Sequence, residues 1–446
     1  MNNRKPTLNT QHSTLNKKGQ KLRTYLSPIL CLLAVIGLFA YLAWVMGLAN
    51  ALNTIMNTAH DLLLNTVFYL MGICVITSAI GRLFVDFGVV TLLEKLLRPL
   101  MRPLFNLPGV ASLGAAMTFL SDNPAIISLA KDPQFKRYFR KYEYISLTNF
   151  GTAFGMGLLV MVFMVGHGFI AAPLVGLFGA FCGCIVSTRL MQRFILKQYP
   201  HYKEESADNQ GGAVRSVIPI YREPHPTASV APADERQNST GDAGVSPAVD
   251  KHCTENSETN VTSPSSCVLN PSSPSSVFLR ILNALLDGGK AGVEVGIAII
   301  PGVLIISTLV MVLTFGAGTD GYTGAAYQGT ALLPWLAGKI SFVFDWLFGL
   351  QDPHLVAFPI TALGAVGAAL GLIPSFMEQG WIDGNAIAVF TAIGMCWSGF
   401  LSTHTAMLDS IGYRQLTSKA ILAHTIGGIA AAFAAHWLFV LVSYFL

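Results

Sequence analysis

Long apolar runs separated by short polar segments dominate this chain of 446 residues. A helix needs about 20 mostly apolar residues to cross the roughly 30 Å hydrocarbon core of a bilayer. Seven runs approach or exceed that length, which predicts spans at 28–49, 65–85, 144–166, 168–188, 291–314, 384–403 and 420–445. Because a polar basic tail precedes the first run, we expect a retained transmembrane helix there rather than a cleaved signal peptide.

Two further apolar regions, near 107–130 and 354–373, are interrupted by proline, glycine and polar residues. Non-helical backbone is tolerated at membrane depth where it is buried in protein or lines a cavity. We therefore expect two re-entrant hairpins, each of which enters and leaves on the same side of the membrane.

The order of elements repeats. In each half a span is followed by an amphipathic stretch (Leu92–Arg102 or Leu332–Leu350), a broken hairpin and another span. The hairpins also open alike, with Leu107–Ala116 beside Phe358–Gly367. The predicted topology starts the two units on opposite sides, so the fold class is an all-α membrane protein with two inverted-topology repeats.

Charge orients this arrangement. Of the 28 Lys and Arg residues, only Lys339 lies outside when the N-terminus is placed in the cytoplasm. Basic residues collect in cytoplasmic loops, so the map predicts an inner-membrane protein with an external C-terminus. With 52% hydrophobic and 12% charged residues, against about 25% charged in soluble domains, the composition agrees with a membrane location.

A polar stretch rich in proline and serine, 198–276, separates the halves and is expected to be a disordered cytoplasmic linker. The predicted division of the chain is a basic tail (1–27), a first transmembrane helix with an external loop (28–64), repeat 1 with an additional span (65–197), the linker (198–276), repeat 2 (277–412) and a last transmembrane helix (413–446).

The first hairpin is broken by Ser121–Asp122–Asn123–Pro124. Pro124 stops helix continuation, and the restarted helix offers free N–H groups and a positive dipole end. A carboxylate at membrane depth is costly, so Ser121, Asp122 and Asn123 are candidates for solute or ion binding. The alternative is that one of them only caps the second half-helix.

Polar residues also lie in the spans that follow the hairpins. Thr148, Asn149 and Thr152 follow the first hairpin, and Thr391 and Ser398 occupy the equivalent span of the second half. They either line a cavity with Asp122 or form interhelical hydrogen bonds. His404 either titrates near neutral pH or marks a cytoplasmic helix end, and His424 and His436 do not share one helix face.

This layout resembles the Gate domain, or nucleoside recognition domain, of bacterial inner-membrane proteins of the YjiH-like kind. The resemblance covers about 65–166 and 287–412, and rests on the amphipathic stretch, the small-residue hairpin and the segment Asn149–Phe150–Gly151–Thr152–Ala153–Phe154–Gly155. It implies a transporter-like fold. The phosphate-binding pattern GxxxxGK[ST] is absent from the sequence, as are the acidic and Gln/Thr hairpin signatures of nucleoside transporters.

The function predicted from these features is ion-coupled secondary transport of a small polar solute, with nucleoside-like solutes as one candidate and H⁺ or Na⁺ as the ion. The alternative is a non-transporting membrane scaffold or regulatory subunit. No nucleophile–base pair or Cys/His metal spacing is visible in the sequence, which predicts no enzyme, cofactor or metal site. The basic aromatic segment Phe135–Tyr142 indicates lipid headgroup anchoring rather than nucleic-acid binding. The expected partners are the solute, the ion and the lipid bilayer; a homo-oligomer or a membrane partner is compatible with the sequence.

Overall fold

The structure is a computed structural model that describes residues 28–121, 124–207 and 277–445. The chain divides into two units, one formed by Met1–Ser216 with Arg280–Leu446 and the other by Val217–Leu279. The packing below is that of the first unit. Its described residues are helical, apart from loops and two isolated β-bridges.

Seven helical segments of the described chain are long and apolar enough to cross a membrane: Pro28–Met46, Leu48–Asp86, Lys141–Gly166, Ala171–Gln198, Val277–Thr314, Gly384–Ser410 and Arg414–Phe445. Each contains one predicted span, or nearly all of it. Large apolar side chains are exposed along them, including Phe68 and Ile76 on one segment and Leu422 and Phe433 on another. Since so much exposed apolar surface is unfavourable in water, the prediction of an all-α membrane protein is confirmed.

The first half of the chain, here residues 48–207, begins with a long helix built from α2 (Leu48–Asp61), the π-helical turn η1 (Leu62–Val67) and α3 (Phe68–Asp86). The remaining elements are α4 (Val89–Leu100), η2 (Met101–Phe105), α5 (Ala111–Leu120), α6 (Pro124–Lys131), α7 (Pro133–Lys136), α8 (Lys141–Thr152), α9 (Gly157–Gly166), α10 (Ala171–Gln198) and η3 (Pro200–Lys203). The predicted hairpin at 107–130 is therefore the pair α5 and α6, which contact each other.

The second half, residues 277–445, has the same order. Its long helix consists of α11 (Val277–Pro301), the π-helical turn η4 (Gly302–Ser307) and α12 (Thr308–Thr314). The remaining elements are α13 (Leu332–Gly338), α14 (Ser341–Phe348), η5 (Pro353–Val356), α15 (Ala357–Gly364), α16 (Val366–Leu370), α17 (Ile373–Glu378), α18 (Gly384–Cys396), α19 (Phe400–Ser410), η6 (Arg414–Leu416) and α20 (Thr417–Phe445). The predicted hairpin at 354–373 is broken at Ala365, whose backbone is extended between α15 and α16.

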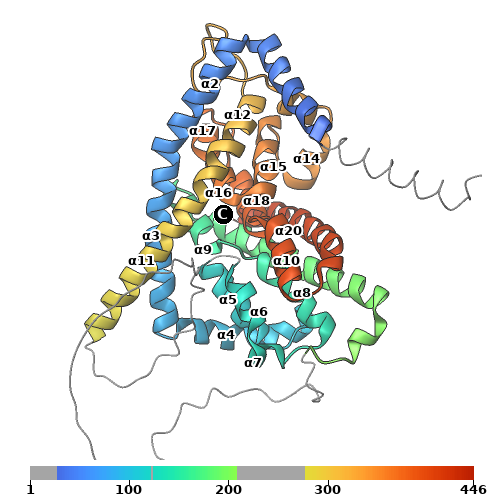
Figure 1. Cartoon of the computed structure of the whole chain (residues 1–446). Helices are drawn as coiled ribbons and strands as arrows, with labels where there is room; N and C mark the ends of the chain where they lie inside the picture. The colour runs from blue at the N-terminus through green and yellow to red at the C-terminus, as the bar shows by residue number, and fades with distance from the viewer. Residues whose placement is uncertain (1–27, 122–123, 208–276, 446) are drawn as a thin grey trace, which may run out of the picture. The chain divides into compact units, whose positions relative to one another are not determined.

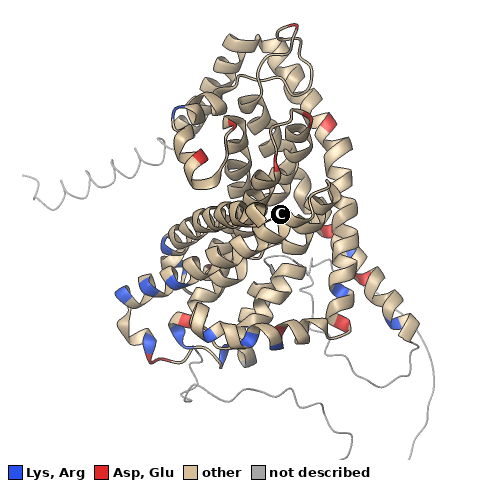
Figure 2. Ribbon diagram, turned by 180° about the vertical axis from the view of Figure 1, so that it is seen from behind, with Lys and Arg blue, Asp and Glu red and all other residues tan. Residues whose placement is uncertain are grey.

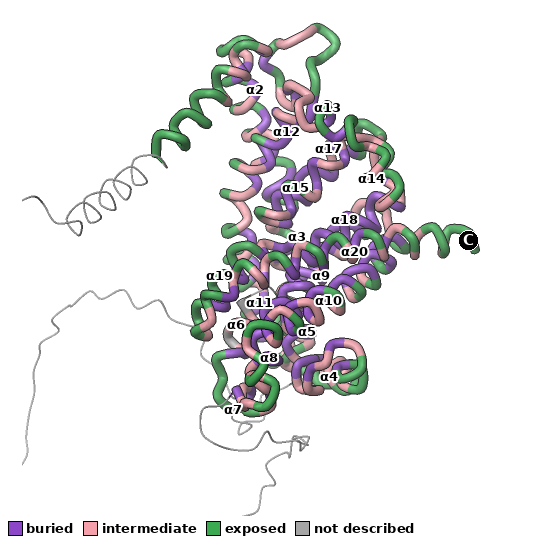
Figure 3. Tube along the Cα trace, turned by 90° about the vertical axis from the view of Figure 1, so that its right-hand side faces the viewer, coloured by how far each residue is buried: buried purple, intermediate pink, exposed green. Residues whose placement is uncertain are grey.

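The long helices of the two halves run antiparallel (Figure 1). Gly288, Gly292 and Gly296 of α11 meet successively earlier residues of α3, from Ser78 back to Met71. Small residues let helix backbones approach closely, which stabilises helix pairs in membranes. Hairpin α5–α6 and hairpin α15–α17 lie toward opposite ends of the long helices, with α9, α10, α18 and α20 between them (Figures 1 and 3).

The helices α10 and α20 also pack antiparallel. Gly179 lies against Ala431 and Ala435, whereas Gly183 lies against Gly427 and Ala431. The ideal Cβ position of Gly183 is 2.4 Å from the Gly427 carbonyl oxygen, so a larger residue would separate the helices. This close contact joins the last long helix of each half.

Three regions differ from expectation. Residues 50–64, expected to form an external loop, are helical because polar side chains of α2 bind the loop before α13. Asn50 Nδ2 donates to the Tyr322 carbonyl at 2.7 Å and Asn57 Nδ2 to the Gly324 carbonyl at 2.8 Å. The Tyr327 hydroxyl of the same loop donates to Asp61. Burial first, and then this hydrogen bond, raise the pKa of Tyr327.

The first ten residues of the predicted linker, 198–207, have a defined conformation. Gln198 ends α10, η3 follows, and 205–207 pair with the backbone before α8. The Lys141 amide donates to the Glu205 carbonyl at 2.9 Å and the Ala207 amide to the Phe139 carbonyl at 2.9 Å. The linker residues 208–276 lie outside the described residues, as does the basic tail 1–27.

The aromatic residues of the predicted headgroup anchor are part of the core. Phe135, Phe139 and Tyr142 are buried, and the Phe135 and Phe139 ring centroids are 4.8 Å apart. The basic residues of this segment and Tyr138 keep some exposed surface, and Figure 2 shows Lys and Arg gathered at the end that holds α4, α7 and the start of α8. The sequence pattern did not separate an inward aromatic face from an outward basic one.

Candidate functional site

Two spans, one in each half, are broken in the middle. The first stops at Thr152 and restarts at Gly157, with Met156 in the left-handed region at φ 54°. The second stops at Cys396 and restarts at Phe400, with Gly399 at φ 59°. A left-handed residue redirects the chain and leaves carbonyl groups at the helix end without helical partners. Each break therefore exposes backbone polar groups inside the protein.

The two breaks meet. Cys396 Sγ lies 3.8 Å from the Ala153 carbonyl oxygen of the other break and 3.8 Å from the Ala180 carbonyl oxygen of α10. Figure 3 shows the buried region where α9, α10, α18 and α20 come together. We call the side chains around this point the junction: Thr148, Asn149, Thr152, Ser187, Cys396, Trp397, His404 and His424.

In each broken span, a glycine packs closely against the hairpin of the same half. The ideal Cβ position of Gly151 is 2.5 Å from Ile126 Cγ1 of α6, and that of Gly394 is 3.1 Å from Val366 Cγ2 of α16. Both glycines lie shortly before the break of their span. A side chain at either position would displace the hairpin, so the hairpins and the breaks form one packed arrangement.

His424 of α20 is at the centre of the junction. Its Nε2 lies 2.5 Å from the Cys396 carbonyl oxygen, which the end of α18 leaves free. A carbonyl only accepts, so Nε2 carries the proton and Nδ1 is the acceptor. The Ser187 hydroxyl accordingly donates to His424 Nδ1 at 2.9 Å. His424 thus links α10, α18 and α20.

Asn149 extends this chain of hydrogen bonds into the first half. Its Nδ2 donates to Ser187 Oγ at 3.0 Å and to the Ala420 carbonyl oxygen at 2.9 Å. The second contact fixes the orientation of the amide, because a carbonyl cannot donate. The order Asn149, Ser187, His424, Cys396 is therefore directional, with each group donating to the next.

Four buried atoms of the junction have no hydrogen-bond partner among the described residues: Thr148 Oγ1, Asn149 Oδ1, Trp397 Nε1 and His404 Nε2. Leaving a buried polar group unpaired costs about 1–3 kcal/mol. Together they offer a hydroxyl, two acceptors and an indole N–H, with no charged side chain. The junction is closed in this conformation, since Thr148, Asn149 and His404 have no exposed surface.

Small residues of α20 make room for this arrangement. Gly428 lies against the Trp397 indole, with its ideal Cβ position 2.0 Å from Nε1, and Gly427 lies against Ser187. His404 of α19 packs its ring on His424, with centroids 4.6 Å apart, and its Nδ1 lies 2.8 Å from the Phe400 carbonyl oxygen. The indole therefore fills the space over Gly428, and the two imidazoles pack on each other beside Phe400.

The structure brings together some of the sequence-predicted site residues. Thr148, Asn149 and Thr152 lie on α8 in the junction, and Thr152 Oγ1 is 3.5 Å from His424 Nε2. Ser398 is buried in the second break. The Thr391 hydroxyl donates to the Ile387 carbonyl of its own helix at 2.7 Å, and its side chain packs on Gly176.

The remaining candidates are at the first hairpin. Ser121 is exposed at the end of α5, and Asp122 and Asn123 lie outside the described residues. Sequence reasoning missed Ser187, Trp397 and the roles of His404 and His424. His404 is not at a helix end but inside α19, with no exposed surface. The sequence feature that could have indicated these roles is His424, three residues before the pair Gly427–Gly428 in the last span.

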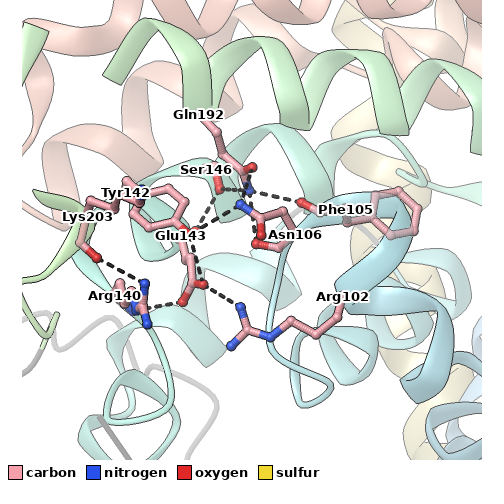
Figure 4. Close-up of polar contacts among 9 residues, drawn as sticks. All are labelled: Arg102, Phe105, Asn106, Arg140, Tyr142, Glu143, Ser146, Gln192 and Lys203. Atoms are coloured by element: carbon pink, nitrogen blue, oxygen red, sulfur yellow. Dashed lines mark hydrogen bonds and ion pairs between the residues drawn. The ribbon is translucent and has the colours of Figure 1, made fainter. Parts of the chain in front are cut away.

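A second polar network lies at the start of α8 (Figure 4). The buried Glu143 carboxylate accepts from Arg102 Nη1 at 2.6 Å and from the Arg140 amide at 2.9 Å. Gln192 of α10 donates to the Phe105 carbonyl oxygen at 3.0 Å and to Ser146 Oγ at 3.2 Å. The network fastens η2 to α8 and α10, and so holds the amphipathic segment against the broken span.

The ordered beginning of the linker adds an ion pair to this end. Lys141 bonds Glu205, and Arg140 Nη1 donates to the Lys203 carbonyl oxygen at 3.2 Å. The hydrogen bond from Lys141, together with its charge, lowers the pKa of Glu205 below its ordinary value. These groups are at the surface and fasten the chain after α10 to the start of α8.

Fold and junction together define a multi-pass helical membrane protein in which two broken helices share a buried polar centre. Residues 67–168 match the model of the Gate family, described as nucleoside recognition. This match confirms the resemblance for the first half of the chain. Comparisons with curated proteins and with solved structures found no match.

Proposed function

We propose that this protein is a secondary transporter that moves a small polar solute, coupled to H⁺ or Na⁺, through the interface of two inverted Gate-like repeats. The antiparallel pairs α3 with α11 and α10 with α20 support two units of opposite orientation. Inverted units with broken helices in matching positions are typical of secondary transporters, whose sites lie where the units meet. The meeting point here is the junction.

The observation that carries the proposal is the set of unpaired buried polar atoms at the junction, above all Thr148 Oγ1, Asn149 Oδ1 and Trp397 Nε1. A solute with donors and acceptors would satisfy these atoms and repay their desolvation. Because the atoms are buried, the solute reaches them only when the halves move apart. Binding would therefore be tied to a conformational change, as alternating access requires.

The match to a nucleoside recognition family makes nucleosides the first solutes to test. Ser121, Asp122 and Asn123 stay in the proposal as solute- or ion-binding residues at the hairpin break. The proposed location is the inner membrane, with the basic end in the cytoplasm, the N-terminus inside and the C-terminus outside.

The test is uptake of radiolabelled uridine and adenosine into proteoliposomes by wild-type protein and by Thr148→Val. The change removes only a hydroxyl that lacks a partner among the described residues, so the fold is retained. We expect at least about a tenfold loss of uptake, equivalent to one lost hydrogen bond of about 1.4 kcal/mol. Thr391→Val is the matched control, because that hydroxyl bonds only its own helix, and should leave uptake within about twofold of wild type.

Two results would contradict the proposal. Equal uptake by Thr148→Val and wild type would remove Thr148 from the solute site. Absence of uptake and of any nucleoside-dependent thermal shift, together with a membrane protein that co-purifies in fixed ratio, would establish the scaffold alternative instead.

A further inference from the structure

We infer that His404 Nε2 is a proton-binding site and that H⁺ is the ion coupled to transport. This inference rests on the proposed function and specifies its ion. The two imidazoles of the junction come from α19 and α20, and their ring centroids lie 4.6 Å apart.

Hydrogen bonding makes the two rings chemically different. Both nitrogens of His424 are engaged, one as donor to the Cys396 carbonyl and one as acceptor from Ser187. His404 Nδ1 faces the Phe400 carbonyl at 2.8 Å and must therefore carry a proton. His404 Nε2 is then an unprotonated acceptor, and it has no partner in the part of the chain that the structure describes. It can take a proton without breaking a hydrogen bond, whereas His424 cannot.

A proton on His404 Nε2 would convert an acceptor into a donor. The junction already contains a buried acceptor without a donor, Asn149 Oδ1, in the hydrogen-bonded chain that includes His424. In this conformation the new positive charge would be fully buried, and a buried charge without a partner ion costs several kcal/mol. Protonation therefore favours a conformation in which water reaches the junction, and proton release favours the closed one.

Among the titratable groups around α19, the two histidines decide the protonation of the junction. The elements packed against α19 are α6, α8, α15, η6 and α20. α15 has no titratable side chain; the titratable side chains of the others are Lys131 on α6, Lys141, Tyr142, Glu143 and Tyr144 on α8, Arg414 on η6, and Lys419, His424, His436 and Tyr444 on α20. Glu143 pairs with Arg102, Lys141 with Glu205 and Arg414 with Asp409. His424 alone among these is in ring contact with His404.

In the transport cycle only an N–H bond forms and breaks. A proton from water on the side to which the site is open binds His404 Nε2, and it returns to water on the other side after the halves have moved. Solute and proton would share the junction, since Asn149 belongs to both the solute contacts and the hydrogen-bonded chain that reaches His424.

The experiment compares uridine uptake driven by an inward pH gradient, uptake driven by an inward Na⁺ gradient, and solute counterflow without any ion gradient. His404→Gln should lower the ratio of pH-driven uptake to counterflow at least about tenfold relative to wild type. The matched control is His167→Gln, because His167 Nδ1 also faces a carbonyl four residues earlier, at 2.9 Å, but its side chain is partly exposed. It should behave as wild type.

Two outcomes overturn the inference and leave the proposed function standing. One is uptake driven by Na⁺ and not by pH; another is loss of pH-driven uptake in Asp122→Asn but not in His404→Gln. If wild type transports nothing, the proposed function fails, and the proton site is judged by ¹⁵N NMR of histidine rings in purified protein. A resonance that reports protonation on acidification and disappears in His404→Gln supports the site, and its absence overturns it.

Discussion

The backbone of Gly292 on α11 lies so close to Cys74 on α3 that an added Cβ would be 2.5 Å from the Cys74 carbonyl oxygen. This contact joins the long helices of the two halves. It lies in a row of glycines spaced four residues apart, on the helix face that meets α3. The relation between the halves therefore depends on the absence of side chains at a few positions.

Gly292→Ala should lower the free energy of unfolding by about 1–3 kcal/mol, because the methyl group forces α3 and α11 apart. Thermal unfolding in one detergent measures the change. Gly289→Ala on the same helix is the control, since its nearest neighbour is Val75 Cγ1 at 3.7 Å. It should be neutral or stabilising, as alanine has the higher helix propensity. Equal effects of the two substitutions would refute the tight contact.

Gly428→Ala should destabilise the protein by a similar amount, about 1–3 kcal/mol, and displace Trp397. The ideal Cβ position is 2.0 Å from Trp397 Nε1 and 2.5 Å from Cε2. Thermal unfolding and Trp fluorescence report stability and indole environment. Gly72→Ala, where nothing lies within 4 Å of the added Cβ, is the comparison. An unchanged unfolding temperature for Gly428→Ala would mean that the indole does not fill this space.

Arg102→Ala should destabilise the protein more than Glu143→Gln. The first change leaves a fully buried carboxylate without its cation, whereas the second leaves an arginine that is 54% exposed and can turn to water. We expect the free energies of unfolding of the two variants to differ by about 1–3 kcal/mol. The difference is smaller than for a fully buried ion pair, because the arginine is partly solvated. Chemical unfolding measures the difference, and Lys95→Ala on the exposed face of α4 should have little effect. The reverse order of stabilities would contradict this account of the network.

Acid should loosen the contact between the end of α10 and the start of α8. The pKa of Glu205 is lowered by Lys141, so the ion pair stabilises this contact above the ordinary pKa of glutamate and is lost as the pH falls through the lowered value. The Ala207 amide should therefore exchange more slowly in wild type than in Glu205→Gln at neutral pH, and this difference should disappear as the pH falls through the acid range. If the Ala207 amide exchanged equally fast in wild type and in Glu205→Gln at neutral pH, the ion pair would have no role in this contact.

The orientation can be measured with single cysteines in a background without native ones. A membrane-impermeant thiol reagent added to whole cells should label Lys339→Cys and should label Lys95→Cys only after the membrane is opened. The reason is the concentration of Lys and Arg at the α4 end of the protein (Figure 2). Labelling of both positions in intact cells would contradict the inverted arrangement of the two units.

The sequence was sufficient for the elements whose evidence is local. Apolar runs of span length, the break near Pro124, the interrupted region 354–373 and polar residues one turn apart on α8 can all be recognised within short windows. The helical conformation of 50–64 was not predicted, since Asn50 and Asn57 look like loop residues until the loop that accepts their hydrogen bonds is known.

Local sequence determined that this chain is a helical membrane protein and that Thr148, Asn149 and Thr152 lie in a span. Only the tertiary structure decided that Ser187, His404 and His424 join them. Those residues come from three different helices, and what brings them together is the close packing of glycine and alanine on α10 and α20. Contacts across such distances along the chain depend on which helix faces meet, and no short window of sequence contains that information.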